Sequence, residues 1–181
     1  MTIYLYTGNG AGKTTNALGL VVRELGHENN VLMIQFLKWE KKTGEYLFGQ
    51  FWQNVVAENP HNGLIGEFEV YQFGREGWKG FNNLTIEDSI KTKEGLLFAH
   101  NLLVEKHFDL LILDEINLAV YLKLLTMEEV SLFINCLPYD LDIIMTGRHA
   151  TKELMELADV VNIICELKAP KTFIYDEGIQ Y

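Results

Sequence analysis

The stretch Thr7-Gly8-Asn9-Gly10-Ala11-Gly12-Lys13-Thr14-Thr15 decides the fold of this 181-residue chain. It lies between an apolar run, Ile3–Tyr6, and a segment with helical spacing from Lys13 to Leu25. Alternating glycines let a backbone turn its N–H groups toward an anion without Cβ atoms in the way. The N-terminus of a following helix attracts negative charge. The stretch is therefore typical of a phosphate-binding loop (P-loop) between the first strand and the first helix of an α/β domain.

Two side chains at the end of this loop have specific expected tasks. Lys13 brings a positive charge within reach of terminal phosphate oxygens, and the Thr14 hydroxyl is a ligand for Mg²⁺. The loop departs from the pattern G-x-x-x-x-G-K-[ST], because Thr7 stands where the first glycine would be. A purely structural glycine-rich turn is the alternative. The residues expected to contact the nucleotide are Gly8, Asn9, Gly10, Ala11, Gly12, Lys13, Thr14 and Thr15.

The rest of the chain alternates short apolar runs with helical periods, as βα units do. Further strands are expected at Val31–Phe36, Glu67–Phe73, Leu110–Leu113, Ile143–Met145 and Val160–Cys165. Helices are expected at Thr85–His107, after the capping residue Thr126, and at Thr151–Ala158. The stretch from Lys38 to Gly66 is predicted to be a long loop or insertion. The pattern predicts one α/β domain over residues 1–181, with a mostly parallel sheet, flanking helices and the P-loop NTPase (RecA-like) type.

The long helix has one side on which apolar residues recur at helical spacing. These residues are Ile86, Ile90, Leu97 and Leu103. Such a stripe is the usual mark of the side that a helix packs against a core.

Three charged residues follow expected strands and should meet at one edge of the sheet. Asp114 and Glu115 come directly after Leu110–Leu113, and Arg148 comes after the next strand and a Thr-Gly turn. Because the carboxyl ends of parallel strands meet at the same edge, all three should face the P-loop. There Asp114 and Glu115, with Thr14, are candidate Mg²⁺ ligands, and Arg148 is a candidate phosphate clamp. A lone Asp-Glu pair is commonly a solvated turn, but the P-loop context favours function.

Composition and charge exclude several classes of protein. A net charge of −10 argues against a general nucleic-acid binder, which needs a basic face. No uncharged apolar run is long enough to cross a bilayer, and the N-terminus has no signal-peptide pattern. We therefore expect a cytoplasmic protein with no membrane partner. Cys136 and Cys165 are expected to be buried thiols, and the five histidines are expected not to bind metal.

Motifs along nearly the whole chain resemble those of the P-loop type ATP:corrinoid (cob(I)alamin) adenosyltransferases. The family's patterns appear here in its own order: T-G-x-G-x-G-K-T-T at Thr7–Thr15, A-x-G-x-x-x-R at Ala17–Arg23, Q-F-x-K at Gln35–Lys38, G-E at Gly44-Glu45, L-D-E at Leu113–Glu115, T-G-R at Thr146–Arg148 and E-L-x-x-x-A-D at Glu153–Asp159. A P-loop without the first glycine is the family's own variant.

The resemblance implies a reaction and its substrates. Such enzymes transfer the 5′-deoxyadenosyl group of ATP to the cobalt of a reduced corrinoid, with Mg²⁺, and release triphosphate. Co(I) is itself a strong nucleophile, so the protein has to position C5′ and stabilise the leaving group. By this resemblance Lys13, Glu115 and Arg148 carry catalysis, and Arg23 adds a phosphate contact. The family further implies a homodimer and a flavodoxin-like or other electron donor.

The chain also departs from the family pattern, mostly on the corrinoid side. The family's loop lysine is Ala11 here, and its K-H-P is Lys168-Ala169-Pro170. Its G-F-T-W is Gly77-Trp78-Lys79-Gly80, so Trp78 is assigned to the corrinoid and Gly80 replaces the second aromatic, for which Phe81 is a possible substitute. Two alternatives therefore stay open. One is a P-loop NTPase or kinase in which Glu115 orients a water or activates an acceptor, and the other is a non-catalytic, nucleotide-dependent corrinoid-binding protein.

A small basic patch lies in the expected loop after the second strand. It consists of Lys38, Lys41 and Lys42. It has two interpretations, a docking surface for an electron donor or for corrinoid carboxylates, and an ordinary solvated loop.

Overall fold

The sheet of this protein has six parallel strands in the order β3-β2-β4-β5-β1-β6. The computed structural model describes residues 1–58, 65–78, 80–169 and 178. The strands are β1 Ile3–Thr7, β2 Val31–Phe36, β3 Phe68–Phe73, β4 Leu110–Asp114, β5 Asp142–Thr146 and β6 Val160–Ile163. The predicted α/β class is confirmed, and each predicted strand is present.

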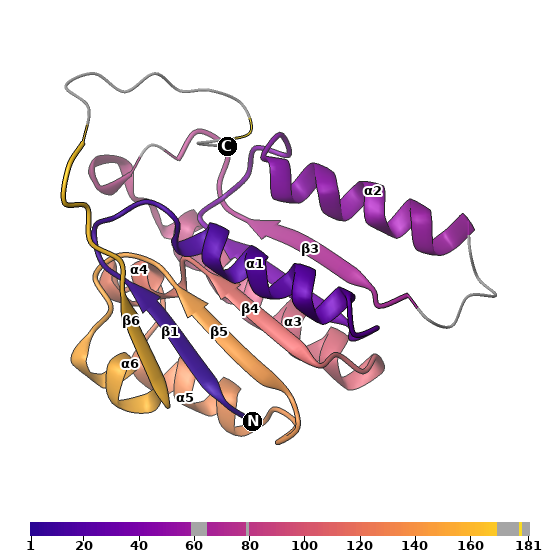
Figure 1. Ribbon diagram of the computed structural model, residues 1–181. Coiled ribbons are helices and arrows are strands. Elements are labelled where there is room, and N and C mark those ends of the chain that lie inside the picture. The colour runs from indigo at the N-terminus through magenta and orange to yellow at the C-terminus, as the bar shows by residue number, and fades with distance from the viewer. Residues whose placement is uncertain (59–64, 79, 170–177, 179–181) are drawn as a thin grey trace.

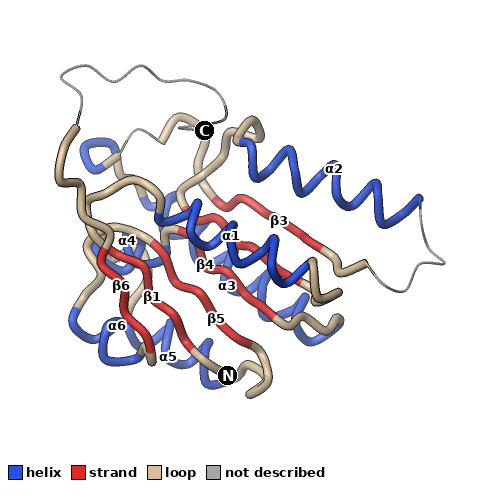
Figure 2. The backbone as a smooth tube through the Cα atoms, viewed as in Figure 1, coloured by secondary structure: helices blue, strands red, loops and turns tan. Residues whose placement is uncertain are grey.

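Helices cover both faces of the sheet (Figures 1 and 2). The helices are α1 Lys13–Leu25, α2 Gly44–Glu58, α3 Ile86–Glu105, α4 Ile116–Tyr121, α5 Met127–Asn135 and α6 Lys152–Leu157. In Figure 1, α1 and α2 lie in front of the sheet and α3 to α6 lie behind it. The predicted cap of α5 is present, because the Thr126 side chain accepts a hydrogen bond from the Glu129 backbone.

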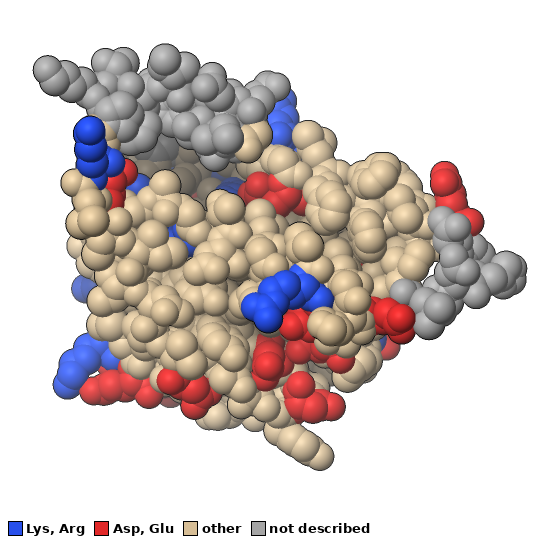
Figure 3. Space-filling model, in the orientation of Figure 1, with Lys and Arg blue, Asp and Glu red and all other residues tan. Residues whose placement is uncertain are grey.

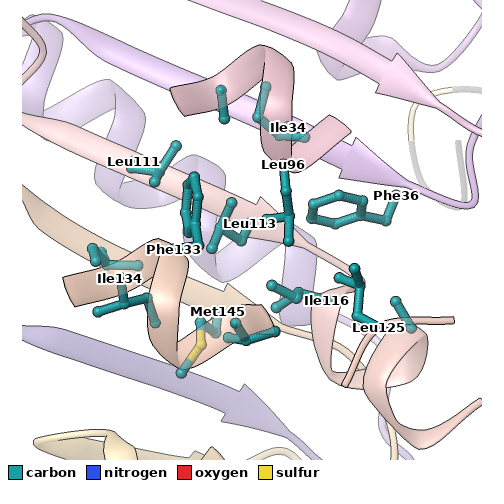
Figure 4. Packing of buried hydrophobic residues seen from close by; sticks show 14 of the residues in the cluster. Ile34, Phe36, Leu96, Leu111, Leu113, Ile116, Leu125, Phe133, Ile134 and Met145 are labelled. Atoms are coloured by element: carbon teal, nitrogen blue, oxygen red, sulfur yellow. The ribbon is translucent and has the colours of Figure 1, made fainter. Parts of the chain in front are cut away.

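Two apolar cores lie on either side of the strands. Along β4, Leu111 and Leu113 belong to the core under α3 to α6, whereas Leu110 and Ile112 belong to the core under α1. Because the central strands are buried on both faces, they show little alternation between apolar and polar residues. Figure 4 shows the rear core, in which strand side chains meet side chains of α3, α4 and α5: Ile34, Phe36, Leu111, Leu113 and Met145 on strands, Leu96, Ile116, Phe133 and Ile134 on helices.

The prediction of a long loop from Lys38 to Gly66 is wrong over most of its length. Residues Gly44–Glu58 form the 15-residue helix α2. Most of the turn-forming residues that suggested a loop cluster after this helix, at positions 59–63, which lie outside the described residues. Gly49 is needed inside the helix, because a Cβ atom there would lie 2.4 Å from a methyl carbon of Val70. The glycine thus lets α2 pack closely on β3.

The apolar side of the long helix is largely exposed. In α3, Ile86, Ile90 and Leu97 are 82%, 49% and 62% exposed, and only Leu103 packs against the core. The buried side carries mostly small or polar residues: Asp88, Thr92, Gly95, Leu96 and Ala99. Small residues on the buried side let the helix approach the sheet closely. Apolar periodicity alone does not indicate a contact of this kind.

Both cysteines differ from expectation as well. Cys136 and Cys165 are free thiols, and both are exposed rather than buried. Cys136 follows the end of α5, and Cys165 lies just after β6. Each is therefore at the end of an element and outside the core. Within the described part of the chain, no helix is both long and apolar enough to cross a membrane.

Candidate functional site

The glycine-rich loop, residues Thr7–Thr15, connects β1 to α1 at the carboxyl edge of the sheet (Figure 1). The chain after β6 braces it: the Ile164 N–H donates to the Thr7 carbonyl at 2.7 Å, and the Gly10 N–H donates to the Ile164 carbonyl at 2.8 Å. Gly8 has a φ of 108°, and a Cβ atom there would lie 2.3 Å from the Ile164 oxygen. The close approach of these two segments therefore requires glycine at position 8.

Lys13 lies in the first turn of α1 with its ammonium group folded over the loop. The side chain is buried, and Nζ donates to the Gly10 carbonyl at 2.6 Å. Burial lowers the pKa of Lys13, and the positive charge of Arg148 acts in the same direction, while Glu115 and Asp114 partly offset both. Lys13 is thus a buried cation held against the backbone of the glycine-rich loop, with acidic side chains close enough to affect its pKa.

Asp114 ends β4 and is completely buried, with both carboxylate oxygens in use. Oδ1 accepts hydrogen bonds from the Thr14 hydroxyl at 2.8 Å and from the Thr146 hydroxyl at 2.6 Å. Oδ2 accepts from Gln35 Nε2 at 2.9 Å and lies 2.9 Å from Lys38 Nζ. Burial disfavours the charged form, but the Lys38 charge and these hydrogen bonds outweigh burial and hold the pKa of Asp114 below its usual range. The predicted convergence of Asp114 on the glycine-rich loop is therefore observed.

Lys38 belongs to this buried network and not to a basic surface patch. Its Nζ lies 3.0 Å from Glu45 Oε1, and the same oxygen accepts a hydrogen bond from Gln35 Nε2 at 2.9 Å. Burial alone would lower the pKa of Lys38, but Asp114 and Glu45 outweigh it and raise the pKa. Lys41 and Lys42 are exposed, which fits the solvated-loop interpretation for them.

Sequence reasoning therefore missed the roles of Gln35, Lys38 and Glu45. The signal was present, because these residues fall in the Q-F-x-K and G-E patterns. Their joint role was hidden because they meet only when β2, α2 and β4 come together. Since α2 itself was not predicted, Glu45 could not be placed beside Asp114.

Glu115 is a strained and buried carboxylate beside the loop. Its φ of 64° is unusual for a residue other than glycine, and such strain is concentrated at functional sites. Oε2 has no hydrogen-bond partner among the described residues. Burial and the negative charge of Asp114 raise the pKa of Glu115, against the opposing effects of Lys38, Lys13 and Arg148. An unpaired buried oxygen of this kind fits a ligand that the site receives.

Arg148 and Arg23, two predicted phosphate contacts, lie in different places. Arg148 follows β5, is exposed, and lies close enough to influence the pKa values of Lys13 and Glu115. Arg23 lies in the last turn of α1, ten residues after Lys13. At 1.5 Å per residue it is about 15 Å along the helix from the loop. The structure thus brings Arg148 to the site and does not bring Arg23.

Trp78 and the positions that depart from the family pattern lie around the same edge. Trp78 follows β3 and packs partly against the rear core, and its indole N–H is buried without a hydrogen-bond partner among the described residues. Ala11 is exposed on the glycine-rich loop, and Ala169 is exposed after β6. Gly80 has a φ of 94°. The side chain of Phe81 lies outside what the structure describes.

In Figure 3, which has the orientation of Figure 1, many acidic side chains lie along the lower edge, near the amino ends of the strands, and others lie in the upper part of the molecule. The described part of the chain has no group of three His, Cys, Asp or Glu residues that could hold a metal by itself. The oxygen donors Thr14 and Glu115 are instead of the kind that binds Mg²⁺ together with nucleotide phosphates and water.

Comparison with known proteins identifies the family. Residues 1–181 match the family model described as ATP:corrinoid adenosyltransferase BtuR/CobO/CobP. The chain is 33% identical over 178 residues to a corrinoid adenosyltransferase of Escherichia coli K12, covering 98% of this chain and 81% of that protein. It is 32% identical over 178 residues to corrinoid adenosyltransferase CobA of Salmonella typhimurium, with the same coverage. A corrinoid adenosyltransferase of Pseudomonas aeruginosa is 30% identical over 159 residues, 88% of this chain and 72% of that protein.

The family model and the relatives both match nearly the whole chain. The sequence identity is spread over nearly the whole chain and is not confined to the glycine-rich loop. This protein belongs to the ATP:corrinoid adenosyltransferase family.

Proposed function

We propose that this protein transfers the 5′-deoxyadenosyl group of ATP to the cobalt of a reduced corrinoid and releases triphosphate. The observation that carries the proposal is the meeting of Lys13, the Thr14–Asp114 hydrogen bond and the strained Glu115 at one edge of the sheet. The glycine-rich loop then acts as a P-loop (Walker A) that holds the triphosphate. The family match over residues 1–181 supports a single nucleotide-binding domain.

Adenosyl transfer requires stabilisation of the negative charge on the leaving triphosphate and does not require a general base. The Co–C5′ bond forms as the C5′–O bond breaks, and the bonding electrons leave with the triphosphate oxygen. Because the leaving group gains negative charge, cations fixed beside it lower the barrier. Lys13 is fixed by the loop, and Arg148 lies near enough to influence its pKa. These two residues are therefore assigned to the departing triphosphate, and Arg23 is too far along α1 to join them.

Thr14 and Glu115 are the residues that would hold Mg²⁺. The Thr14 hydroxyl lies at the start of α1, and Glu115 Oε2 is a buried oxygen without a described partner. When bound, the ion neutralises phosphate charge. Both oxygens of Asp114 already accept hydrogen bonds, so its role is to orient Thr14 more than to bind the metal directly. This assignment refines the sequence-based set of Thr14, Asp114 and Glu115.

The acceptor side is assigned to Trp78, on the family pattern and on its place after β3 at the same edge. The family further supports a homodimer and reduction of the corrinoid by a flavodoxin-like or other electron donor.

Replacing Trp78 with alanine should raise the KM for the reduced corrinoid and leave ATP affinity unchanged. Separate titrations of the two ligands measure this, with Trp52→Ala on α2 as the control. Equal effects on both ligands would contradict the assignment.

The Lys38 network leads to a stability prediction. Lys38→Met should lower the free energy of unfolding at neutral pH by about 3 kcal/mol, because it leaves the buried Asp114 and the half-buried Glu45 without their cation. Both carboxylates have lowered pKa values in the folded protein, so their stabilisation is present above the ordinary values of 3.8 and 4.5 and is lost as pH falls below them. The difference between wild type and variant should therefore shrink in acid.

Urea unfolding at several pH values measures this effect. Lys42→Met, at an exposed position in the same segment, is the matched control and should leave the unfolding free energy nearly unchanged. A Lys38→Met variant as stable as wild type at neutral pH would show that the ion pairs do not hold Asp114 in place.

A second candidate function is ATP hydrolysis or phosphoryl transfer. It is favoured by one observation, the raised pKa of the buried Glu115, which suits a carboxylate that takes a proton from a water or a hydroxyl acceptor. Phosphorus NMR of the products separates the two functions. Triphosphate formed only with reduced corrinoid supports adenosyl transfer, whereas inorganic phosphate formed without corrinoid supports hydrolysis.

A further inference from the structure

Arg75 ties together the two ends of the chain between β3 and α3, of which the structure describes residues 74–78 and 80–84. We call this segment the Trp78 loop. Arg75 Nε donates to Asp88 Oδ1 at 3.1 Å, and Nη2 donates to the Asn83 carbonyl at 2.7 Å. Asp88 lies in the first turn of α3, and its side chain is fully buried, while that of Arg75 is only 15% exposed. One guanidinium therefore ties the beginning of the loop to its end and to the following helix.

Other hydrogen bonds shape the loop around this ion pair. The Trp78 N–H donates to the Arg75 carbonyl at 3.1 Å. The Asn83 side chain donates to the Gly77 carbonyl at 2.9 Å. Asp88 Oδ2 accepts from the Thr85 backbone at 2.7 Å and so also caps α3. The Trp78 backbone is thus hydrogen-bonded directly to Arg75. Arg75 is in turn connected to the start of α3 through Asp88.

The backbone conformation at position 80 of the Trp78 loop allows only glycine. Its φ of 94° and ψ of −162° fall in a region that essentially only glycine occupies. Gly80 stands where the family pattern has its second aromatic residue. An aromatic side chain cannot be placed there without rebuilding the loop, so of the two aromatic positions in the family pattern this chain keeps only the first, Trp78.

We infer that Arg75 and Asp88 are positioning residues for the corrinoid substrate, acting through Trp78. The inference rests on the proposed function, which assigns Trp78 to the corrinoid. The ion pair already orders the loop in the free protein. Corrinoid binding therefore does not lose free energy to the entropy of ordering the loop. The proposed phosphate site lies at β1 and α1, whereas the Trp78 loop follows β3 on the other side of β2. The pair therefore affects corrinoid handling and leaves ATP affinity unchanged.

The test compares Arg75→Met with Arg75→Lys in the whole protein. Hydrogen exchange by mass spectrometry reports the loop itself, and steady-state kinetics report the KM for reduced cobalamin and the affinity for MgATP. For Arg75→Met we expect about tenfold faster exchange in residues 76–84 and a corrinoid KM raised by about tenfold, since a charged hydrogen bond is lost. Arg75→Lys keeps the charge and should recover part of both effects.

Two further variants exclude a general loss of structure. Lys91→Met breaks an exposed ion pair with Glu94 on the same helix and should change neither readout. Asp88→Asn keeps oxygen for the cap of α3, loses the charge that binds Arg75, and should behave like Arg75→Met. Unchanged exchange peptides from α1 would show that the phosphate side is intact.

The outcomes separate this inference from the proposed function. Unchanged loop exchange in Arg75→Met would overturn the inference even if Trp78→Ala raises the corrinoid KM. Faster exchange with an unchanged corrinoid KM would overturn it as well. Failure of the unsubstituted protein to adenosylate cobalamin would overturn the proposed function, and the inference with it.

Discussion

Lys13→Ala is expected to lower kcat by about a thousandfold, the size of effect seen when a fixed charge-stabilising group is removed. Lys13 is only 6% exposed and is fixed over the loop by its bond to the Gly10 carbonyl. The Lys13 ammonium is therefore held in place before ATP binds. Its loss should also weaken ATP binding, because the terminal phosphates lose their nearest cation.

The measurement is a nucleotide titration with steady-state kinetics. Lys152→Ala on α6, where the side chain is 83% exposed, is the matched control and should behave like wild type. A thermal unfolding curve for Lys13→Ala should resemble that of wild type, since the buried Asp114 keeps its hydrogen bonds and its ion pair with Lys38. Near-normal activity in Lys13→Ala would refute the phosphate-binding assignment of the glycine-rich loop.

Among glycine-to-alanine substitutions in the glycine-rich loop, Gly8→Ala should be the most destabilising. Its Cβ would lie 2.3 Å from the Ile164 carbonyl oxygen, a backbone atom that cannot swing aside, at a φ of 108° that disfavours any side chain. We expect the brace between the loop and the chain after β6 to open, with a loss of about 3 kcal/mol in unfolding free energy. Nucleotide affinity should fall with it, because the loop loses its fixed shape.

Gly19→Ala supplies the matched comparison. Gly19 lies within α1, and a Cβ atom there would meet nothing within 4 Å. Alanine inside a helix is favoured over glycine by up to about 1 kcal/mol, so this variant should be slightly more stable than wild type. Urea unfolding and ATP titration of both variants measure the contrast. Equal stability of the two variants would contradict the proposed brace.

Much of the fold can be predicted from local patterns. The bounds of α1 and β2 agree with the sequence-based prediction, because a glycine-rich loop marks the start of α1 and an unbroken apolar run marks β2. The meeting of Thr14 with Asp114 also follows from a general rule, since parallel strands end at one edge of a sheet. These features depend on short sequence segments and on topology.

What could not be predicted depends on contacts between distant elements. The pairing of Lys38 with Asp114 and Glu45 needs α2 to lie beside β2, and α2 was hidden by turn-forming residues that follow it. Ile86 and Leu97 mark an apolar side of α3, which the structure leaves exposed because close packing uses small residues instead. Side-chain size at a contact is a tertiary property, which periodicity does not report.

The most direct test of adenosyl transfer is an anaerobic incubation of the protein with MgATP and chemically reduced cobalamin. We predict a light-sensitive product with a Co–C bond, accompanied by free triphosphate in equal amount. Both products should disappear when the corrinoid is left unreduced. ATP binding without either product, or phosphate release that does not require reduced corrinoid, would contradict the proposed function.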